Sequence, residues 1–401
     1  MKQVLLNDVG EVTKLAGFEF TKYMEYIPDG EIIAIRALNL KDGCLQLDDV
    51  KKISRHVSDV LPRSQLHVND IVLSYTGTLG ECAQIREEGK YHLAPNVAKI
   101  TPRKNIDPDY LFQIIRSKEF KNEVMNYSHG STQRTIPMKI IRVLPIKILP
   151  LDQQHKVASI LKNLDEKIEI NKYINKNLLK QVISLYNQLV ESFDWPSATI
   201  QDIADKVAMG PFGSNIKVST FVSSGIPIIS GNHLRGYFLE EPEFNYITEE
   251  HAVQLKNSIV YPRDIIFTHA GNIGQVAMIP NDCRYDYYVL SQRQFYLRCN
   301  ENKVVPEFIL MFFHSDVGQH ELLSYANQTG VPSISRPATN LKKIRFKCPS
   351  LEVQRQWLWQ VRPLLFLYLN NRRESKYLSA LRDTLLPKLV SGELNISDAA
   401  L

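Results

Sequence analysis

The chain has 401 residues, a formal net charge of +5, five cysteines and a hydrophobic fraction of 44%. That length is enough for two or three domains with buried cores, and the charge is mild for a protein that binds nucleic acid. The longest apolar run falls far short of the roughly 20 residues of a membrane span, no secretory pattern opens the chain, and the cysteines form no C-x-x-C pair. We therefore expect a cytoplasmic protein with no disulfide framework and no zinc knuckle.

The second half of the chain repeats the first half at a distance of 194 to 200 residues. Asp70–Gly80 returns as Asp264–Gly274, and both segments read as strand, glycine turn and strand. Further on, Tyr110–Tyr127 is echoed by Phe308–Tyr325. A period near 200 residues is far longer than the roughly 20 to 50 residues of a solenoid unit. A whole domain plus a helix is duplicated, an arrangement suited to holding two copies of a partner, or two half-sites, at a fixed distance.

The expected elements follow one another twice along the chain. Residues 1–152 are predicted to form a first globular domain, with an amphipathic helix that begins at Tyr110 and runs through Phe120 and Val124. Residues 153–195 are predicted to form a long central helix. Residues 196–350 then form a second globular domain, and residues 351–401 form a second long helix with a tail.

Basic residues gather beside a loop of small polar residues in each half. Between Arg103 and Lys147 nine basic residues stand against four acidic ones. Arginine and glutamine can make bidentate bonds to purine edges, while serine and threonine contact phosphates. The alternative is an ordinary solvated loop, because glycine, serine and asparagine are common turn residues. The DNA-binding candidates are Ser74, Tyr75, Thr76, Thr78, Ser131, Thr132, Gln133, Arg134, Lys139, Thr268, His269, Asn272, Asn327, Gln328, Thr329, Ser333, Arg336, Lys342 and Lys343.

Both long helices carry a heptad pattern, from Val157 to Leu189 in the first and from Trp357 to Leu389 in the second. Helices with such an apolar seam pair with another helix, so we expect the two to form an antiparallel coiled coil. The charged outer faces are either solvated or used to dock another subunit.

The register of this pairing is predicted from the polar residues in the seam. One alignment sets Asn171 opposite Ser375 and Asn175 opposite Asn371, so that the four polar side chains meet each other. Sliding by a heptad would leave amides on apolar partners at a cost of roughly 1 to 3 kcal/mol each.

Two residues do not fit this seam. Arg382 is expected to lay its stem along Leu164 while its charged head reaches water. Pro363 is expected to kink or delay the second helix.

Motifs for catalysis are absent from the sequence. It contains no P-loop, no zinc-protease helix, no nucleophile elbow, and no Asn-Pro-Pro-aromatic segment of the kind that holds a flipped base. Pro108–Asp109 followed by Glu119–Lys121 has the spacing of a metal-dependent nuclease, but it falls on a predicted helix where that chemistry requires a strand. The glycine turns lead into strands, so they cannot hold a dinucleotide at a helix N-terminus. We assign no catalytic residue and no metal ligand.

The order of these segments resembles the DNA-specificity subunit of type I restriction-modification systems. The resemblance covers essentially the whole chain, and its most specific part is the ending Leu385-Leu386-Pro387-Lys388-Leu389-Val390-Ser391-Gly392-Glu393-Leu394. The other segments that carry it are Pro150-Leu151-Asp152-Gln153-Gln154, Ile160-Leu161-Lys162-Asn163-Leu164-Asp165-Glu166-Lys167-Ile168 and Gly210-Pro211-Phe212-Gly213-Ser214.

The resemblance implies an α+β fold with two similar target-recognition domains, separated by two long helices that pair as an antiparallel coiled coil, in an internal pseudo-twofold repeat. Each domain would read one half of a bipartite asymmetric site in double-stranded DNA. The chain would be non-catalytic and bind no cofactor itself. Two modification subunits would bind S-adenosylmethionine and methylate adenine, and restriction subunits would use ATP and Mg²⁺.

The first half departs from the family pattern at its opening, because Leu15–Phe20 has no Gly-Pro-Phe-Gly-Ser counterpart. The two domains therefore should not read the same half-site. Two other functions compete with a DNA-reading scaffold: an enzyme, either a methyltransferase or a nuclease, and a helical adaptor that binds only proteins.

Overall fold

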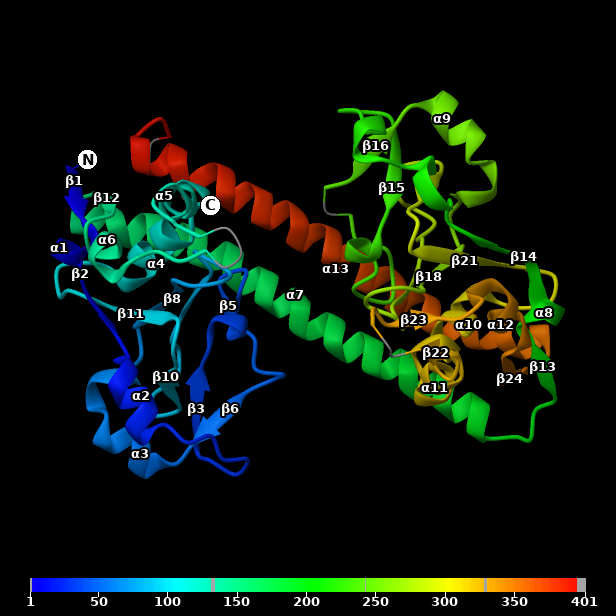
Figure 1. The fold of residues 1–401 in the computed structure, drawn as a ribbon, viewed down its shortest axis with the longest axis horizontal. Helices are drawn as coiled ribbons and strands as arrows, with labels where there is room; N and C mark the ends of the chain where they lie inside the picture. The colour runs from blue at the N-terminus through cyan, green and yellow to red at the C-terminus, as the bar shows by residue number, and fades with distance from the viewer. Residues whose placement is uncertain (1, 131–133, 242, 328–329, 395–401) are drawn as a thin grey trace. The chain divides into compact units, whose positions relative to one another are not determined.

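The computed structural model describes residues 2–130, 134–241, 243–327 and 330–394. The chain divides into two compact units. Unit 1 comprises Met1–Tyr173 with Asn371–Leu401, and unit 2 comprises Ile174–Asn370. Helices α7 (Leu151–Glu191) and α13 (Leu351–Ser391), green and orange to red in Figure 1, each contribute to both units.

Unit 1 contains two four-stranded sheets. The first has the order β2-β11-β8-β9 and is antiparallel throughout, whereas the second has the order β6-β3-β10-β7 and pairs β3 with β10 in parallel. The bounds in the first sheet are β2 (Gly10–Lys14), β8 (Ile71–Ser74), β9 (Cys82–Gln84) and β11 (Val97–Pro102). The bounds in the second are β3 (Ile32–Ile35), β6 (Lys51–Ile53), β7 (Gln65–Leu66) and β10 (Tyr91–Leu93). Two small pairs are β1 (Lys2–Leu5) with β12 (Pro145–Ile148) and β4 (Leu40–Lys41) with β5 (Cys44–Leu45).

The helix predicted to begin at Tyr110 and run through Phe120 and Val124 is two helices in the structure. The break falls at Ser117, whose Oγ accepts a hydrogen bond from the Phe120 amide at 3.1 Å and so caps the second helix. A serine at this position satisfies an amide that has no partner within the helix. The helices of unit 1 besides the two long ones are α1 (Leu6–Val9), α2 (Gly17–Tyr23), α3 (Arg55–Val60), α4 (Pro108–Arg116), α5 (Lys118–Asn126) and α6 (Met138–Arg142), with 3-10 turns at Ala37–Asn39 and Pro62–Ser64.

Unit 2 repeats this architecture. Its sheets have the orders β14-β21-β18-β19 and β16-β15-β20-β17, with β15 and β20 parallel. The strands of these sheets are β14 (Ala204–Met209), β15 (Ile226–Ile229), β16 (Asn245–Ile247), β17 (Ile259–Val260), β18 (Ile265–Thr268), β19 (Val276–Met278), β20 (Tyr288–Leu290) and β21 (Gln294–Cys299). The small pairs are β13 (Ser197–Thr199) with β24 (Arg345–Lys347) and β22 (Ala326–Asn327) with β23 (Ser333–Ile334). Its helices are α8 (Ile200–Ile203), α9 (Glu249–Gln254), α10 (Pro306–His314), α11 (Asp316–Leu323) and α12 (Pro337–Lys343), with 3-10 turns at Gly213–Asn215, Val218–Thr220, Gly231–His233 and Lys256–Ser258.

One glutamine near the start of each long helix ties the helix to its globular region. Gln154 accepts from the Asp107 amide at 2.9 Å and donates to the Leu149 carbonyl at 2.8 Å. In unit 2, Gln354 does the same with the Val305 amide and the Pro349 carbonyl, at 3.0 and 2.8 Å. Both glutamines are essentially fully buried. Gln154, the second glutamine of Pro-Leu-Asp-Gln-Gln, therefore has a structural role. It forms hydrogen bonds with backbone groups that would otherwise be unsatisfied.

Within each unit, α7 and α13 run antiparallel. In unit 1 the Asn171 side chain donates to Ser375 Oγ at 3.4 Å and to Glu374 Oε2 at 2.7 Å. In unit 2 the Asn175 side chain donates to the Tyr368 carbonyl at 3.1 Å. The predicted proximity of Asn171 to Ser375 is therefore confirmed, and Asn371 is buried in the same helix, where its carbonyl accepts from Ser375 Oγ.

The expectation for Arg382 in the second long helix was wrong. The head of Arg382 does not reach water, since its side chain is 12% exposed and donates to Asp165 Oδ1 at 2.7 Å. Pro363 does not delay the helix, because α13 begins at Leu351 and continues through the proline, whereas a kink at this residue stays a prediction. Pro363 is exposed, as is Trp359 one turn earlier, so water can reach the backbone carbonyl that the proline leaves without an N–H partner.

Candidate nucleic-acid interface

In unit 1, two groups of predicted DNA-binding residues meet at one end of the first sheet. Strands β2 and β8 both run antiparallel to β11, so both end on the same side. The glycine turn after β8 is bonded to the polar loop after α5: the Gly77 amide donates to the Arg134 carbonyl at 3.0 Å, and Thr76 Oγ1 lies 2.9 Å from Thr135 Oγ1. Gly77 has a φ of 83°, a conformation that glycine adopts without strain.

Unit 2 joins the corresponding segments in the same way. The Gly271 amide donates to the Pro332 carbonyl at 2.9 Å, and the Ile334 amide donates to the His269 carbonyl at 2.8 Å. Ala270 forms an isolated bridge with Ser333. In each unit, the glycine turn and the polar loop, about 60 residues apart in the sequence, therefore form one surface. The sequence had indicated such a surface, because a polar loop beside a basic cluster occurs in both halves.

The cations of these loops are available to a ligand. Arg134, Lys139, Arg336 and Lys343 are exposed, and none of them forms an ion pair with a residue in the described part of the chain. Arg336 has φ 40° and ψ 57° and caps the start of α12. This left-handed conformation is uncommon for arginine and places the residue at a sharp change of chain direction.

The other candidates differ in accessibility. Thr78, Asn272 and Asn327 are exposed, whereas Tyr75, Thr76, His269, Ser333 and Lys342 are half-buried. Ser131, Thr132, Gln133, Gln328 and Thr329 lie outside the described residues.

Ser74 and Thr268, by contrast, are in the core, at 0% and 2% exposure. Ser74 Oγ donates to the Thr76 carbonyl at 3.2 Å, and Thr268 Oγ1 donates to Gln275 Oε1 at 3.1 Å. In this structure the two side chains brace the glycine turns and do not face solvent, which corrects the prediction of direct contact for them.

Two half-buried aromatic residues support the turns. Burial raises the pKa of Tyr75, over whose ring Lys14 Nζ lies at 5.6 Å. Burial lowers the pKa of His269, whose Nε2 donates to the Gln292 carbonyl at 3.1 Å. His269 is therefore predominantly neutral at pH 7, and it acts as a hydrogen-bonding side chain and not as a cation.

Gln292 and Arg293 precede β21 and border the glycine turn of unit 2, and neither was predicted from the sequence. The His269 amide donates to the Arg293 carbonyl at 2.9 Å, just as the Tyr75 amide donates to the Asn96 carbonyl in unit 1 at 3.0 Å. Arg293 is exposed, and no ion pair to it exists within the described residues. Arg293 could have been found from the sequence, because it directly precedes a strand that is repeated in both halves of the chain.

Two residues of the basic cluster between Arg103 and Lys147 form ion pairs and are not free to bind phosphate. Lys121 pairs with Glu81 at 2.7 Å, and Arg116 pairs with Asp165 at 2.7 Å. The local excess of positive charge in unit 1 is therefore smaller than the sequence count indicates.

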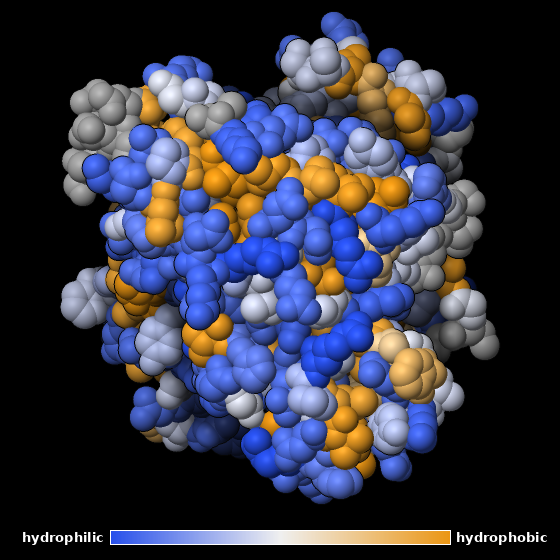
Figure 2. Space-filling model, turned by 90° about the vertical axis from the view of Figure 1, so that its left-hand side faces the viewer, coloured by the Kyte–Doolittle hydropathy of each residue, from blue (hydrophilic) through white to orange (hydrophobic). Residues whose placement is uncertain are grey.

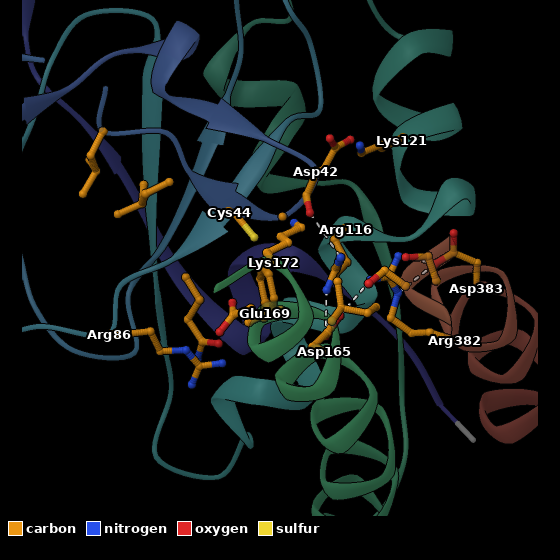
Figure 3. A pocket seen from close by; sticks show the side chains of 18 of the residues that line it. Asp42, Cys44, Arg86, Arg116, Lys121, Asp165, Glu169, Lys172, Arg382 and Asp383 are labelled. Carbon is orange, nitrogen blue, oxygen red and sulfur yellow. Dashed lines mark hydrogen bonds and ion pairs between the residues drawn. The ribbon is translucent and has the colours of Figure 1, made fainter. Parts of the chain in front are cut away.

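Unit 1 also contains a charged pocket of about 790 Å³ between the β4–β5 hairpin, α4, α7 and α13 (Figure 3). Its lining includes Arg86, Lys172 and Lys376 with Glu87 and Glu169, so positive and negative charges alternate around it. None of the fourteen predicted DNA-binding residues that the structure describes lines it, although Ser375 from the helix register does.

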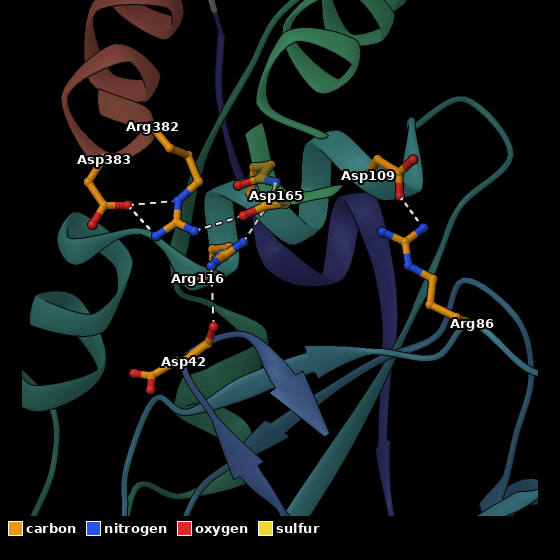
Figure 4. Close-up of polar contacts among 8 residues, drawn as sticks. Asp42, Arg86, Asp109, Arg116, Asp165, Arg382 and Asp383 are labelled. Carbon is orange, nitrogen blue, oxygen red and sulfur yellow. Dashed lines mark hydrogen bonds and ion pairs between the residues drawn. The ribbon is translucent and has the colours of Figure 1, made fainter. Parts of the chain in front are cut away.

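A cluster of ion pairs lies against this pocket (Figure 4). Asp165 accepts from Arg116 Nη1 and Gln113 Nε2 through Oδ2, at 2.7 and 2.6 Å, and from Arg382 Nη1 through Oδ1. Arg382 also donates to Asp383 at 2.7 Å. Burial acts to raise the pKa of Asp165, but the charges of the two arginines outweigh it and hold that pKa below its ordinary value. The cluster thus joins α4, α7 and α13 through ion pairs that are charged at pH 7.

The described residues contain no group of three histidine, cysteine or acidic side chains placed to hold a metal ion. Among them, likewise, no helix is long and apolar enough to cross a membrane. Figure 2 shows one face of the molecule, on which most side chains are hydrophilic. Apolar side chains lie among them and form a band across the upper part of this view.

Comparison with known proteins gives consistent results. The MjaIX specificity subunit of a type I restriction enzyme from Methanocaldococcus jannaschii is 22% identical over 328 residues, covering 75% of this chain and 72% of that protein. The MjaVIII specificity subunit from the same organism is 21% identical over 351 residues, covering 82% and 80%.

The same fold occurs in the crystal structure of the type I restriction-modification S subunit from M. genitalium, with a TM-score of 0.52 at 14% identity, covering 97% of this chain and 95% of that chain. The relatives are named as specificity subunits, which agrees with the prediction of a non-catalytic subunit. The family described as type I restriction modification DNA specificity domain matches residues 1–180 and 194–358. Because these two matches span most of the chain, the protein belongs to the family of type I restriction-modification DNA specificity subunits.

Proposed function

We propose that the chain reads a bipartite, asymmetric site in double-stranded DNA, with one half-site for each globular region. The observation that carries this proposal is the repeated surface at one sheet end, where a glycine turn is bonded to a polar loop beside cations that form no ion pair with a described residue. Such cations contact phosphates, while arginine and the loop amides contact base edges. The two loops differ in sequence, which supports an asymmetric site.

The chain acts in the cytoplasm as the specificity component of a larger complex and scaffolds two modification subunits and the restriction subunits. It supplies no cofactor site in this proposal. S-adenosylmethionine, ATP and Mg²⁺ are bound by the partner subunits, and adenine methylation and cleavage take place there.

Base reading is assigned to Arg134 with Gln133 in the first region, and to Arg336 with Gln328 and Thr329 in the second. A guanine contact by either arginine contributes roughly 1 to 3 kcal/mol of discrimination at one base pair. The two half-sites therefore depend on different loops, and a change in one loop leaves the other half-site unchanged.

The test is methylome sequencing of cells that express the modification subunit with wild-type chain, Arg134→Ala or Arg336→Ala. We expect each variant to relax one position of one half-site. Lys51→Ala and Lys256→Ala remove exposed cations at the second sheet of each unit and serve as controls. If both arginine variants methylate the wild-type sites alone, these loops are not the readers.

A salt-dependent gel shift separates a DNA reader from an adaptor that binds only proteins. Phosphate contacts make affinity fall steeply as the salt concentration rises. Binding that is absent at low salt, or that does not change with salt, would favour the adaptor.

A further inference from the structure

Each globular region presents an exposed phenylalanine directly after an edge strand of its first sheet. Phe18 and Phe212 are both 71% exposed. Strand β2 ends at Lys14, four residues before Phe18, and β14 ends at Met209, three residues before Phe212. A single exposed apolar side chain needs no explanation. An exposed phenylalanine at the same place in both repeats, within dissimilar sequences, does need an explanation.

Both phenylalanines follow strands that end on the side where the glycine turns begin. In unit 1, Lys14 pairs with Ala98 while Ser74 pairs with the neighbouring Val97. In unit 2, Met209 pairs with Phe295 while Thr268 pairs with the neighbouring Gln294. The two phenylalanine segments therefore leave the sheet beside the surfaces that carry Arg134 and Arg336.

The segment that holds Phe212 is firmly anchored. Its start is packed against the backbone, since a Cβ on Gly210 would lie 2.0 Å from the Ser291 carbonyl oxygen. The side-chain amide of Gln292 donates to the Gly213 carbonyl and, at 3.2 Å, to the Ile216 carbonyl. An exposed aromatic ring on an anchored segment loses little conformational entropy when it binds.

Gln292 also connects this segment to the DNA-facing turn. Its carbonyl accepts from His269 Nε2 at 3.1 Å, and its neighbour Arg293 is exposed. The ring of Phe212 thus belongs to a surface with a cation that no described acid neutralises.

Phe18 is fixed by a short helix. Helix α2 begins at Gly17, and the Ala16 amide donates to Glu19 Oε2 at 3.0 Å. Phe20 and Tyr23 of the same helix pack against a core cluster to which both sheets of unit 1 contribute. Phe18 is exposed, whereas Phe20 and Tyr23 of the same helix are half-buried.

We propose that Phe18 and Phe212 determine specificity by making one apolar contact each with the bases of their own half-site, and that Gln292 is the positioning residue for Phe212. The contact is made with the methyl group of thymine or with an unstacked base step, the two ways in which phenylalanine reads DNA. This inference rests on the proposed function. The nearby cations hold phosphates and favour DNA over an apolar protein partner.

The experiment uses the chain assembled with its modification subunit and a DNA library in which each half-site is randomised separately. Phe18→Ala is expected to relax one position in the first half-site and Phe212→Ala one position in the second, each with roughly a tenfold loss of preference. Affinity for non-specific DNA should stay unchanged, because it depends on phosphate contacts. Phe→Leu variants keep an apolar side chain and should retain part of the preference.

Matched controls are Leu38→Ala and Val218→Ala, which truncate other exposed apolar residues of the two units. Gln292→Glu keeps the size of the side chain but places a carboxylate against the Gly213 and Ile216 carbonyls. It should relax the same position as Phe212→Ala at an unchanged melting temperature. A purely structural role would instead lower the melting temperature and leave the profile as it is.

Unchanged profiles for both phenylalanine variants would overturn the inference, as would a loss confined to assembly with the modification subunit. Failure of the proposed function is a different outcome. In that case the wild-type chain itself would show no preference between library members, and Arg134→Ala and Arg336→Ala would have no effect.

Discussion

The two units attach a globular region to the paired helices in different ways, on an otherwise repeated frame. Gln154 and Gln354 make the same pair of hydrogen bonds in both. Beyond them, unit 1 uses the ion-pair cluster of Arg116, Asp165 and Arg382. The residues at the corresponding positions of unit 2 are His314, Leu365 and Val182.

The junction of unit 2 is apolar where that of unit 1 is charged. Leu365 and Val182 are 6% and 0% exposed. The His314 ring stacks on Tyr237 with the centroids 3.8 Å apart, and its Nε2–H donates to the Val276 carbonyl at 2.9 Å. Burial lowers the pKa of His314 to about 4, so the side chain is neutral at pH 7.

The two copies of this duplicated fold share the hydrogen bonds that buried backbone groups require, but they differ in how the space between the helices is filled. A buried backbone amide and carbonyl require a partner in either copy, so the glutamine recurs. The space between helices can be filled by ion pairs or by apolar groups, because a well-packed apolar cluster can replace a buried ion pair at little cost. The charged junction of unit 1, however, depends on every member of the cluster.

The largest expected effect follows from removing the shared acid of unit 1. Asp165→Ala leaves Arg116 and Arg382, with side chains 11% and 12% exposed, without their main counter-charge. We expect the free energy of unfolding to fall by about 3 kcal/mol, as is usual when one partner of a buried pair is lost. Urea unfolding measures this. The exposed neighbour Glu166→Ala is the control, and equal losses for both variants would contradict the assigned role.

The shared glutamines should be equivalent. Gln154→Ala and Gln354→Ala each leave a buried amide and carbonyl unpaired, so we expect a loss of about 2 kcal/mol in either unit. Lys156→Ala and Gln356→Ala, exposed at corresponding positions of the same helices, should change stability by less than about 0.5 kcal/mol. Losses that differ by more than about 1 kcal/mol between the two glutamine variants would break the equivalence.

Mild acid should weaken unit 2 before the Asp165 cluster of unit 1. The pKa of His314 is about 4 in the folded protein and about 6.5 when unfolded, so the unfolded chain binds more protons as the pH falls through this window. Stability is thus lost on acidification, by about 1.3 kcal/mol between pH 7.5 and 5.5. Asp165, whose pKa is lowered, keeps its contribution above its unfolded pKa and loses it only as the pH falls further.

This pH effect is measured as the difference between wild type and His314→Phe, which keeps an aromatic ring against Tyr237 but cannot be protonated. The difference is needed because burial also lowers the pKa values of His92, His233 and His269. A pH dependence that is identical in wild type and variant would mean that His314 does not titrate in this window.

The smallest expected effect concerns the helix register in unit 1. Asn171→Leu removes the bonds to Glu374 and Ser375 and should cost about 1 kcal/mol. Adding Ser375→Leu should recover most of this loss, because two apolar side chains then face each other. A double-mutant cycle measures the coupling, and purely additive effects would show that the two residues do not pack together.

Local pattern was enough to predict much of this protein. The long helices, the two strand–turn–strand segments and the polar pairing of Asn171 with Ser375 follow from apolar periodicity, glycine placement and the duplication. These signals depend on neighbours in sequence, or on a repeat that can be aligned without knowing the fold. The break at Ser117 was also visible in principle, since serine is a common helix cap.

Burial and charge pairing were decided by tertiary structure alone. Ser74 and Arg134 both belonged to the predicted interface, yet one is in the core and the other in solvent. Arg116 and Arg134 were counted in the same basic cluster, but of the two only Arg116 pairs with an acid among the described residues, namely Asp165 of a helix distant in sequence. The free energy of a charge depends on the groups that the fold brings within a few ångströms, and sequence composition does not contain that information.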